Sequence, residues 1–171
     1  MKKASLFIVT VLVVFSAMAF AAEVTIAGHD LVSSGTYAGA SGFGLGIMFG
    51  DNNALVLKSW INSIDAMQYD LEYNLYGKYA GIGVAYLIHN FDIIKVEDNK
   101  VPLYFGLKVY AAVYNGTALC AGVEVPLGID WIFKNYPIDI SFDVDPGVQF
   151  INPSGASRFA WGDGIGARYW F

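Results

Sequence analysis

A strict alternation of apolar and polar residues, repeated along most of the chain, is the feature that most constrains its fold. Residues 67–75 show it without exception: the odd positions hold Met, Tyr, Leu, Tyr and Leu, and the even positions hold Gln, Asp, Glu and Asn. A period of two residues is typical of a β-strand that presents one apolar and one polar face.

Seven further segments alternate in the same way. They are residues 43–49, 54–61, 80–88, 103–110, 119–131, 138–144 and 161–171. Clusters of Gly, Asn, Asp, Ser and Pro lie between them and are typical of turns. Because short turns join antiparallel neighbours, the sequence predicts an all-β, eight-stranded antiparallel sheet of up-and-down topology.

The two faces of these strands differ in a way that indicates which of them points inward. Bulky apolar residues occupy one face, whereas the other face carries many of the 19 glycines. A tight lumen favours glycine, while a water-facing surface favours lysine and glutamate. The sequence therefore favours a transmembrane β-barrel whose apolar face meets lipid. A soluble exported barrel with the faces exchanged is the alternative.

Charged residues within the predicted strands all lie on the small or polar face. We expect them to form a polar network in the lumen, which comprises Lys58, Asp70, Glu72, Lys108, Glu124, Asp130, Asp139, Asp143, Asp145 and Arg168. A turn centred near Ser154 would bring Arg168 close to residues 139–143 on the neighbouring strand. We therefore hypothesise that Lys58, Lys108 and Arg168 offset the lumen carboxylates and plug the barrel.

Aromatic residues gather near the ends of the predicted strands. They are Phe49, Trp60, Tyr76, Tyr79, Phe91, Tyr114, Trp131, Phe133, Tyr136, Phe150, Phe159, Trp161, Tyr169 and Trp170. This arrangement is typical of the aromatic girdles at a membrane interface. The alternative is that aromatic residues are simply common in β-strands.

The first residues differ from the rest of the chain. A positively charged start is followed by an apolar run over residues 4–15 and by the small-x-small pattern of a cleavage site. This order predicts a cleaved secretory signal peptide over residues 1–21. An uncleaved anchor over residues 4–22 is the alternative. A polar N-terminal stretch over residues 22–40 and the barrel over residues 41–171 would follow.

Composition excludes several classes of protein. A single cysteine cannot form an intrachain disulfide, and two histidines are too few for a typical zinc module. A net charge of −5 at pH 7 offers no attraction to the phosphates of nucleic acids. We therefore predict no metal, no cofactor and no nucleic-acid partner.

The end of the chain has a recognisable pattern. Ile165, Ala167, Tyr169 and Phe171 alternate up to the terminal aromatic residue. This pattern resembles the C-terminal strand by which bacterial outer-membrane barrels are recognised for assembly. We expect these four residues to form an assembly signal.

The whole chain resembles the small eight-stranded outer-membrane barrels of the OmpA/OmpX type, and more closely a group of short, largely uncharacterised bacterial outer-membrane proteins. The closer resemblance rests on GFGLGIMFGDNNALVLKSWI (42–61), YLIHNFDII (86–94), VPLYFGL (101–107) and VPLGIDWIF (125–133). It implies a location in the bacterial outer membrane, with outer-membrane lipids and the barrel-assembly machinery as partners. It implies no activity.

One feature departs from that family. Such barrels usually place their long loops outside the cell, whereas here the longest connection, residues 90–100, would lie on the periplasmic side. Either the strand count is wrong by one, or the exterior loops are short.

Few residues suggest chemistry, and each has a structural interpretation. The glycines of residues 42–46 and 162–166 superficially resemble a nucleotide-binding loop, but their period of two indicates lumen-facing strand glycines. His89 ends a strand and is interpreted as an interfacial residue, and the sequence gives His29 no partner. Cys120 is interpreted as a small lumen filler rather than a reactive thiol.

Asp143 and Asp145 lie two residues apart on one face, so about 6.6 Å separates their Cα atoms. A pair of glycosidase carboxylates would also need an open cleft, which an eight-stranded barrel lacks. A buried polar network is the simpler interpretation.

Three functions remain as hypotheses. We expect a non-enzymatic outer-membrane protein with a structural or surface-interaction role, whose extracellular partner no motif identifies. The alternative is a narrow, cation-preferring, porin-like pore, because seven acidic residues face three basic ones in the predicted lumen. The third is a lipid-modifying envelope enzyme that uses His89, although no serine lies convincingly beside that histidine.

Overall fold

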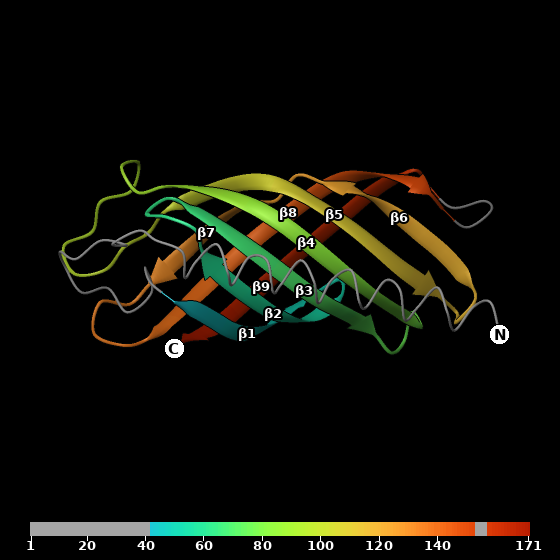
Figure 1. Ribbon diagram of the computed structural model, residues 1–171, viewed down its shortest axis with the longest axis horizontal. Helices are drawn as coiled ribbons and strands as arrows, with labels where there is room; N and C mark the ends of the chain where they lie inside the picture. Colours follow the sequence, from blue (N-terminus) through green and yellow to red (C-terminus); the bar gives the residue numbers. More distant parts are fainter. Residues whose placement is uncertain (1–41, 153–156) are drawn as a thin grey trace. The chain divides into compact units, whose positions relative to one another are not determined.

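The computed structural model describes residues 42–152 and 157–171, which belong to one compact unit built from β-strands (Figure 1). The predicted signal peptide (1–21), the polar stretch (22–40) and His29 lie outside the described residues.

Nine strands follow one another along this part of the chain. They are β1 Phe43–Gly50, β2 Asn53–Trp60, β3 Asp65–Asn74, β4 Tyr79–Asn90, β5 Leu103–Tyr114, β6 Ala118–Glu124, β7 Leu127–Ile132, β8 Ile138–Ile151 and β9 Phe159–Trp170. Short turns join several of them. Between β5 and β6, Asn115 and Gly116 have φ values of 49° and 70°, and both central residues of a type I′ hairpin turn need a positive φ.

β6 and β7 are two halves of one strand. Lys108 of β5 faces Glu124, and Phe105 of β5 faces Leu127, so the register of β5 continues unbroken from β6 into β7. The interruption falls at Pro126, which has no backbone N–H to donate. Its carbonyl still accepts a hydrogen bond from the N–H of Gly106 over 2.9 Å. The predicted strand over residues 119–131 therefore exists, with a local break.

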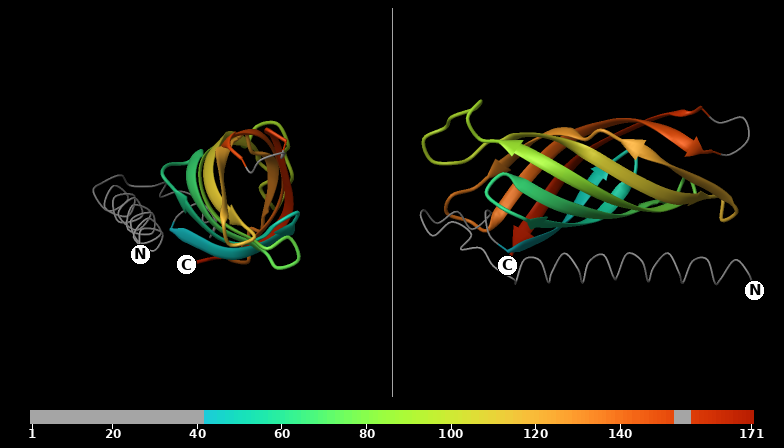
Figure 2. Two further views of the ribbon diagram at one scale, coloured as in Figure 1. Left: turned by 90° about the vertical axis from the view of Figure 1, so that its right-hand side faces the viewer. Right: turned by 45° about the horizontal axis from the view of Figure 1, so that its top comes forward.

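Every strand pairs antiparallel with its neighbours, and β9 pairs with β1. With β6 and β7 counted together, the sheet closes into a ring of eight strands, and Figure 2 shows this ring viewed along the barrel. The predicted all-β, eight-stranded antiparallel topology is confirmed. Closure leaves neither β1 nor β9 with a free edge over the paired residues.

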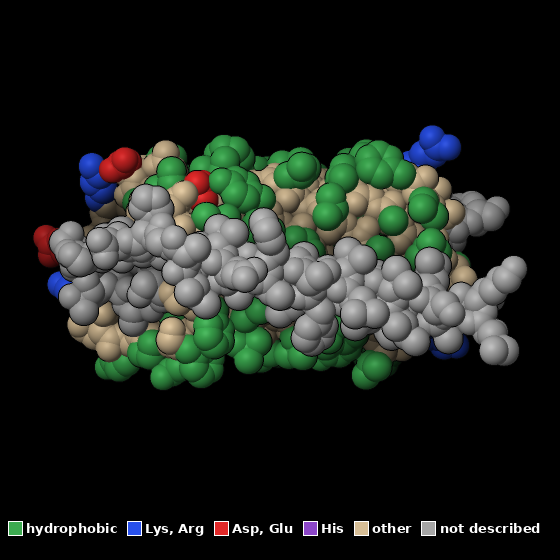
Figure 3. Space-filling view, in the orientation of Figure 1, with side chains coloured by type: hydrophobic (Ala, Val, Ile, Leu, Met, Phe, Trp, Pro, Cys, Tyr) green, Lys and Arg blue, Asp and Glu red, His purple; other side chains and the backbone are tan. Residues whose placement is uncertain are grey.

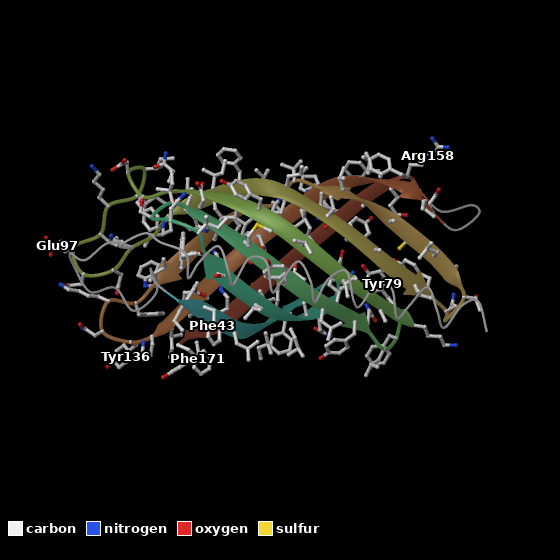
Figure 4. All side chains as sticks on the ribbon, in the orientation of Figure 1. Phe43, Tyr79, Glu97, Tyr136, Arg158 and Phe171 are labelled. Atoms are coloured by element: carbon white, nitrogen blue, oxygen red, sulfur yellow. The ribbon has the colours of Figure 1, made fainter. Side chains whose placement is uncertain are left out.

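β1 begins and β9 ends at the same end of the barrel, which we call the terminal end; the opposite one is the far end (Figure 1). The rings of Phe43 and Phe171 stack there with centroids 5.2 Å apart, and Figure 4 shows both toward this end. The connection between β4 and β5, residues 91–102, also lies at the terminal end. The strand count is therefore not wrong by one.

Side chains alternate between the inside and the outside of the ring. Along β9, Trp161, Ile165 and Tyr169 are exposed, whereas Arg168 and Trp170, which flank Tyr169, are buried. Over the described part of the face in Figure 3, hydrophobic side chains cover the middle and charged side chains gather toward the two ends. The strands thus hold most of their charged residues inside the barrel and most of their large apolar residues outside it.

Candidate functional site

The interior of the barrel contains all ten charged residues that the sequence assigned to a lumen network. Each is buried: Lys58, Asp70, Glu72, Lys108, Glu124, Asp130, Asp139, Asp143, Asp145 and Arg168. They come from seven of the nine strands, and the ring brings them together although they lie far apart in the sequence. Nine of them divide into two groups along the barrel, and the tenth, Asp143, accepts a hydrogen bond from Tyr104.

The first group, called the neutral cluster, lies toward the terminal end and consists of Lys58, Asp130, Asp139 and Arg168. Lys58 Nζ donates to Asp130 Oδ2 over 2.5 Å. Arg168 Nη2 donates to Asp130 Oδ1 over 2.6 Å, and Arg168 Nε donates to Asp139 Oδ1 over 2.9 Å. Two cations therefore face two carboxylates.

Arg168 ties the walls of the barrel together. It lies on β9 and donates to Asp139 on β8, to Asp130 on β7 and, from Nη1 over 3.3 Å, to the side-chain oxygen of Gln68 on β3. Trp170 Nε1 donates to Asp139 Oδ2 over 2.7 Å. The guanidinium therefore bridges the interior from one side to the other, and its planar set of donors suits this role.

An aromatic layer closes the interior beyond the neutral cluster. Trp60 and Trp170 stack with ring centroids 6.1 Å apart, and Ala66 and Ile132 pack with them. Phe91, at the start of the β4–β5 connection, packs against the same layer. The predicted membrane-interface role is therefore wrong for Trp60 and Trp170, because both side chains point into the barrel.

His89 belongs to this layer too, and the interfacial interpretation of it is corrected. The residue is 2% exposed and its ring lies 4.5 Å from that of Trp60. His89 Nδ1 lies 3.0 Å from the carbonyl oxygen of Ile64, and Nε2 lies 3.4 Å from Asp130 Oδ2. Its neighbours are thus inside the barrel rather than at its outer surface.

The second group, called the acidic cluster, lies farther from the terminal end. Lys108 Nζ stands among four carboxylates from β3, β6 and β8. The distances are 2.5 Å to Glu72 Oε1, 3.3 Å to Asp70 Oδ2, 3.4 Å to Glu124 Oε2 and 3.9 Å to Asp145 Oδ2. One ammonium group therefore faces four carboxyl groups.

Neutral side chains supply further hydrogen bonds to the carboxylates. Tyr79 donates to Glu72 over 2.7 Å, Tyr104 donates to Asp143 Oδ2 over 2.9 Å, and Gln68 Nε2 donates to Asp70 over 3.1 Å. Sequence reasoning missed these donors, and it wrongly placed Tyr79 in the girdle. Parity along β4 would have found Tyr79, since it lies in step with the inward-facing residues of that strand.

Glycines make room for the long charged side chains. A Cβ built on Gly83 would lie 2.6 Å from Lys108 Cε, and one on Gly166 would lie 2.6 Å from Ser141 Oγ. A Cβ on Gly46 would lie 2.5 Å from Arg168 Cγ. These glycines therefore face the lumen, and their side-chain space is already filled.

A second packed layer lies toward the far end. It contains Cys120 together with Tyr79, Tyr110, Ala112 and Ala160. The Cys120 thiol is fully buried. A filler role fits this environment better than a reactive one, because reactive thiols are partly exposed and sit in electropositive surroundings.

The four predicted assembly-signal residues lie on the outer face of β9 or directly after it. Ile165, Tyr169 and Phe171 are exposed large hydrophobic residues, and Ala167 is exposed between them. The structure thus leaves this apolar face of β9 accessible from outside the barrel.

Within residues 42–152 and 157–171, no helix has the length and hydropathy to span a bilayer. In the same ranges no group of three or more His, Cys, Asp or Glu side chains is arranged to hold a metal ion. Comparisons of the chain with protein-family models, with curated proteins and with solved structures found no match. The case for a function therefore rests on the geometry of the barrel.

Proposed function

We propose that the chain is a non-enzymatic outer-membrane β-barrel protein with a structural or surface-interaction role and a plugged lumen. The observation that carries this proposal is the inverted distribution of side chains. Charged residues fill the interior, while exposed large apolar residues occur on the outside of all nine strands. Such a surface matches hydrocarbon better than water.

The size of the apolar surface argues against a soluble barrel. Soluble monomers rarely expose contiguous apolar patches larger than roughly 300–600 Å². Here side chains such as Leu107, Phe142 and Ile165, each about half exposed, recur on strand after strand. Removing that surface from water is worth roughly 25 cal/mol per Å², so a lipid environment would stabilise the folded barrel substantially.

The exceptions on the outer face lie near the rims. Among the described strand residues, the outward-facing charged ones are Asp65 and Asp163. Asp65 is the first residue of β3, and Asp163 lies just beyond Gly164, the last β9 residue that pairs with β1. Charges near the membrane interfaces are far less costly than charges at the midplane.

A plugged lumen favours a structural role over transport. The aromatic layer at the terminal end, the neutral cluster, the acidic cluster and the layer around Cys120 follow one another along the interior. The sequence resemblance to small outer-membrane barrels points to the same membrane. If both termini face the periplasm, short turns such as residues 115–117 would face outward and offer the surface for a partner.

Reconstitution tests the membrane assignment. We expect the full-length chain to fold when diluted from urea into lipid vesicles, and the folded form to migrate differently from the boiled form on a denaturing gel. Extraction with carbonate should leave it in the vesicles. A chain that stays monomeric and folded in buffer without any amphiphile would contradict the proposal.

A cation-preferring pore is the second candidate, and the acidic cluster is the observation that favours it. Planar-bilayer recording separates the two candidates. A plugged barrel shows no steady conductance, whereas steady cation-selective current from single barrels would favour the pore.

A further inference from the structure

The acidic cluster has a charge imbalance that no other described group offsets. Four carboxylates surround the single ammonium of Lys108. Buried carboxylates are stable only when they are paired and hydrogen-bonded, or when they take up a proton or a cation. The neutral cluster meets this requirement with its own residues, but the acidic cluster does not.

A second observation comes from Asp143, which is not one of the four carboxylates around Lys108. The residue is 2% exposed, and its Oδ2 accepts the hydrogen bond from Tyr104. Its Oδ1 is buried and has no hydrogen-bond partner within the described residues; the same is true of Asp145 Oδ1. Both carboxylates lie on the inner face of β8, with Cα atoms about 6.6 Å apart.

There is room for a small group beside Asp145. Gly162 faces Asp145 across the β8–β9 pair. The three atoms nearest to a Cβ built on Gly162 all belong to Asp145, at 3.4, 3.8 and 4.0 Å. At Gly46, Gly83 and Gly166, by contrast, a neighbouring side chain already occupies the equivalent space.

Solvent reaches this part of the interior. The side chains of Glu124 and Asp145 are 11% and 12% exposed, whereas those of Lys58 and Asp130 are fully buried. Because the neutral cluster and the aromatic layer close the terminal end, a small solute would enter from the far end, past the layer around Cys120. The acidic cluster is therefore reached from one end only, and we call the region around it the chamber.

We propose that this chamber binds a small ammonium-type cation, held between Asp143 and Asp145 beside Gly162. Cationic N–H groups would donate to the two unpartnered carboxylate oxygens and offset the negative charge, and charge-assisted hydrogen bonds of this kind are strong. Lys108 shows that this part of the interior accommodates an ammonium group among carboxylates, with Glu72 and Asp145 both within 4 Å of it. An N–H donor also needs no convergent set of metal ligands. The inference goes beyond the proposed function, because these groups lie inside the barrel whatever surrounds it.

Calorimetric titration of the full-length chain, folded in detergent micelles, tests the proposal. Methylammonium chloride is the probe, with tetramethylammonium chloride and sodium chloride compared at equal ionic strength. We expect one methylammonium to bind per barrel, at least tenfold more tightly than either of the other cations. Equal affinity for tetramethylammonium or sodium would overturn the role of the N–H donors, and no binding at all would overturn the site.

Two variants and a matched control locate the site. Asp145→Asn removes one acceptor charge, and Gly162→Ala fills the space while leaving every charge in place. Both should weaken methylammonium binding at least tenfold, whereas Asp163→Asn, which removes an exposed outward carboxylate from the same strand as Gly162, should not change it. Unchanged binding in Gly162→Ala would mean diffuse attraction and would overturn the site.

The same preparations separate this inference from the proposed function. Heat-modifiable gel mobility and insertion into vesicles report on the barrel and on its membrane environment. A barrel that inserts but binds no methylammonium overturns the chamber alone. A chain that binds methylammonium while folded in plain buffer overturns the membrane assignment alone.

Discussion

The neutral cluster and the acidic cluster are built by the same alternation of inward and outward residues, yet they differ in charge balance and in access to solvent. In the neutral cluster, Lys58 and Arg168 offset Asp130 and Asp139 in a region that solvent does not reach. In the acidic cluster, Lys108 alone faces four carboxylates that solvent touches. The difference teaches that the position of a residue on a strand decides whether it points inside, but does not ensure that the charges gathered there balance.

The largest effect is expected in the neutral cluster. Arg168→Ala leaves Asp130 with Lys58 and His89, and Asp139 with its hydrogen bond from Trp170. Breaking a buried ion pair by removing one partner costs about 3–5 kcal/mol. Urea titration in lipid vesicles, followed by tryptophan fluorescence, should show a much lower unfolding midpoint. Arg158→Ala at an exposed position is the control, and an unchanged midpoint in Arg168→Ala would remove the plug hypothesis.

Lys108→Met should have the next largest effect on stability. It removes the single cation from the acidic cluster, and we expect a loss of about 2–3 kcal/mol in the free energy of unfolding. The loss should be smaller than for Arg168→Ala because solvent and ions reach these carboxylates and screen them. Raising the salt concentration should recover part of the Lys108→Met loss and none of the Arg168→Ala loss. An equal salt response in both variants would contradict the division into a closed and an open region.

A pair of glycine substitutions compares the packing of the two regions. A Cβ on Gly46 would overlap the carbonyl oxygen of Ala167 and press on Arg168, so Gly46→Ala should cost about 1–3 kcal/mol. A Cβ on Gly162 would make only ordinary contact with Asp145, so Gly162→Ala should change stability by less than about 0.5 kcal/mol. The same urea titration measures both. Equal losses would mean that the chamber is as tightly packed as the neutral cluster.

A small effect of the opposite sign is expected from Asp145→Asn. Asp145 Oδ2 lies 3.9 Å from Lys108, the longest of the four ion pairs there, so little attraction is lost. Relief of repulsion among the remaining carboxylates should raise the free energy of unfolding by about 1 kcal/mol in the absence of added amines. Asp139→Asn in the neutral cluster is the comparison, and this substitution should lower the free energy of unfolding. If the Asp145→Asn variant is instead less stable, the charge of Asp145 is already offset in the folded barrel.

Much of the fold follows from the sequence because a period of two is a local signal. The strands, their antiparallel order and the inward position of residues such as Asp70 and Arg168 depend only on alternation and turns. The pairing of Arg168 with Asp139 also follows, since β8 and β9 are adjacent hairpin strands.

The contacts across the lumen could not be predicted in the same way. Lys58 meets Asp130, 72 residues away, because the ring closes with a particular tilt and stagger, and no local pattern encodes these quantities. Trp60 and Trp170 were misplaced because their nearness to strand ends was given more weight than their parity. For Trp170 the parity pointed inward, in step with Arg168.

Because the ring closes through β1 and β9, we expect the barrel to form as a whole or not at all. The backbone N–H and C=O groups along one side of β1 have no hydrogen-bond partners until β9 pairs with β1. Removing β9 would expose unpaired backbone on β1 and β8 together and would delete Arg168 as well. A chain cut short by its final dozen residues would therefore lose the whole cylinder rather than an eighth of it.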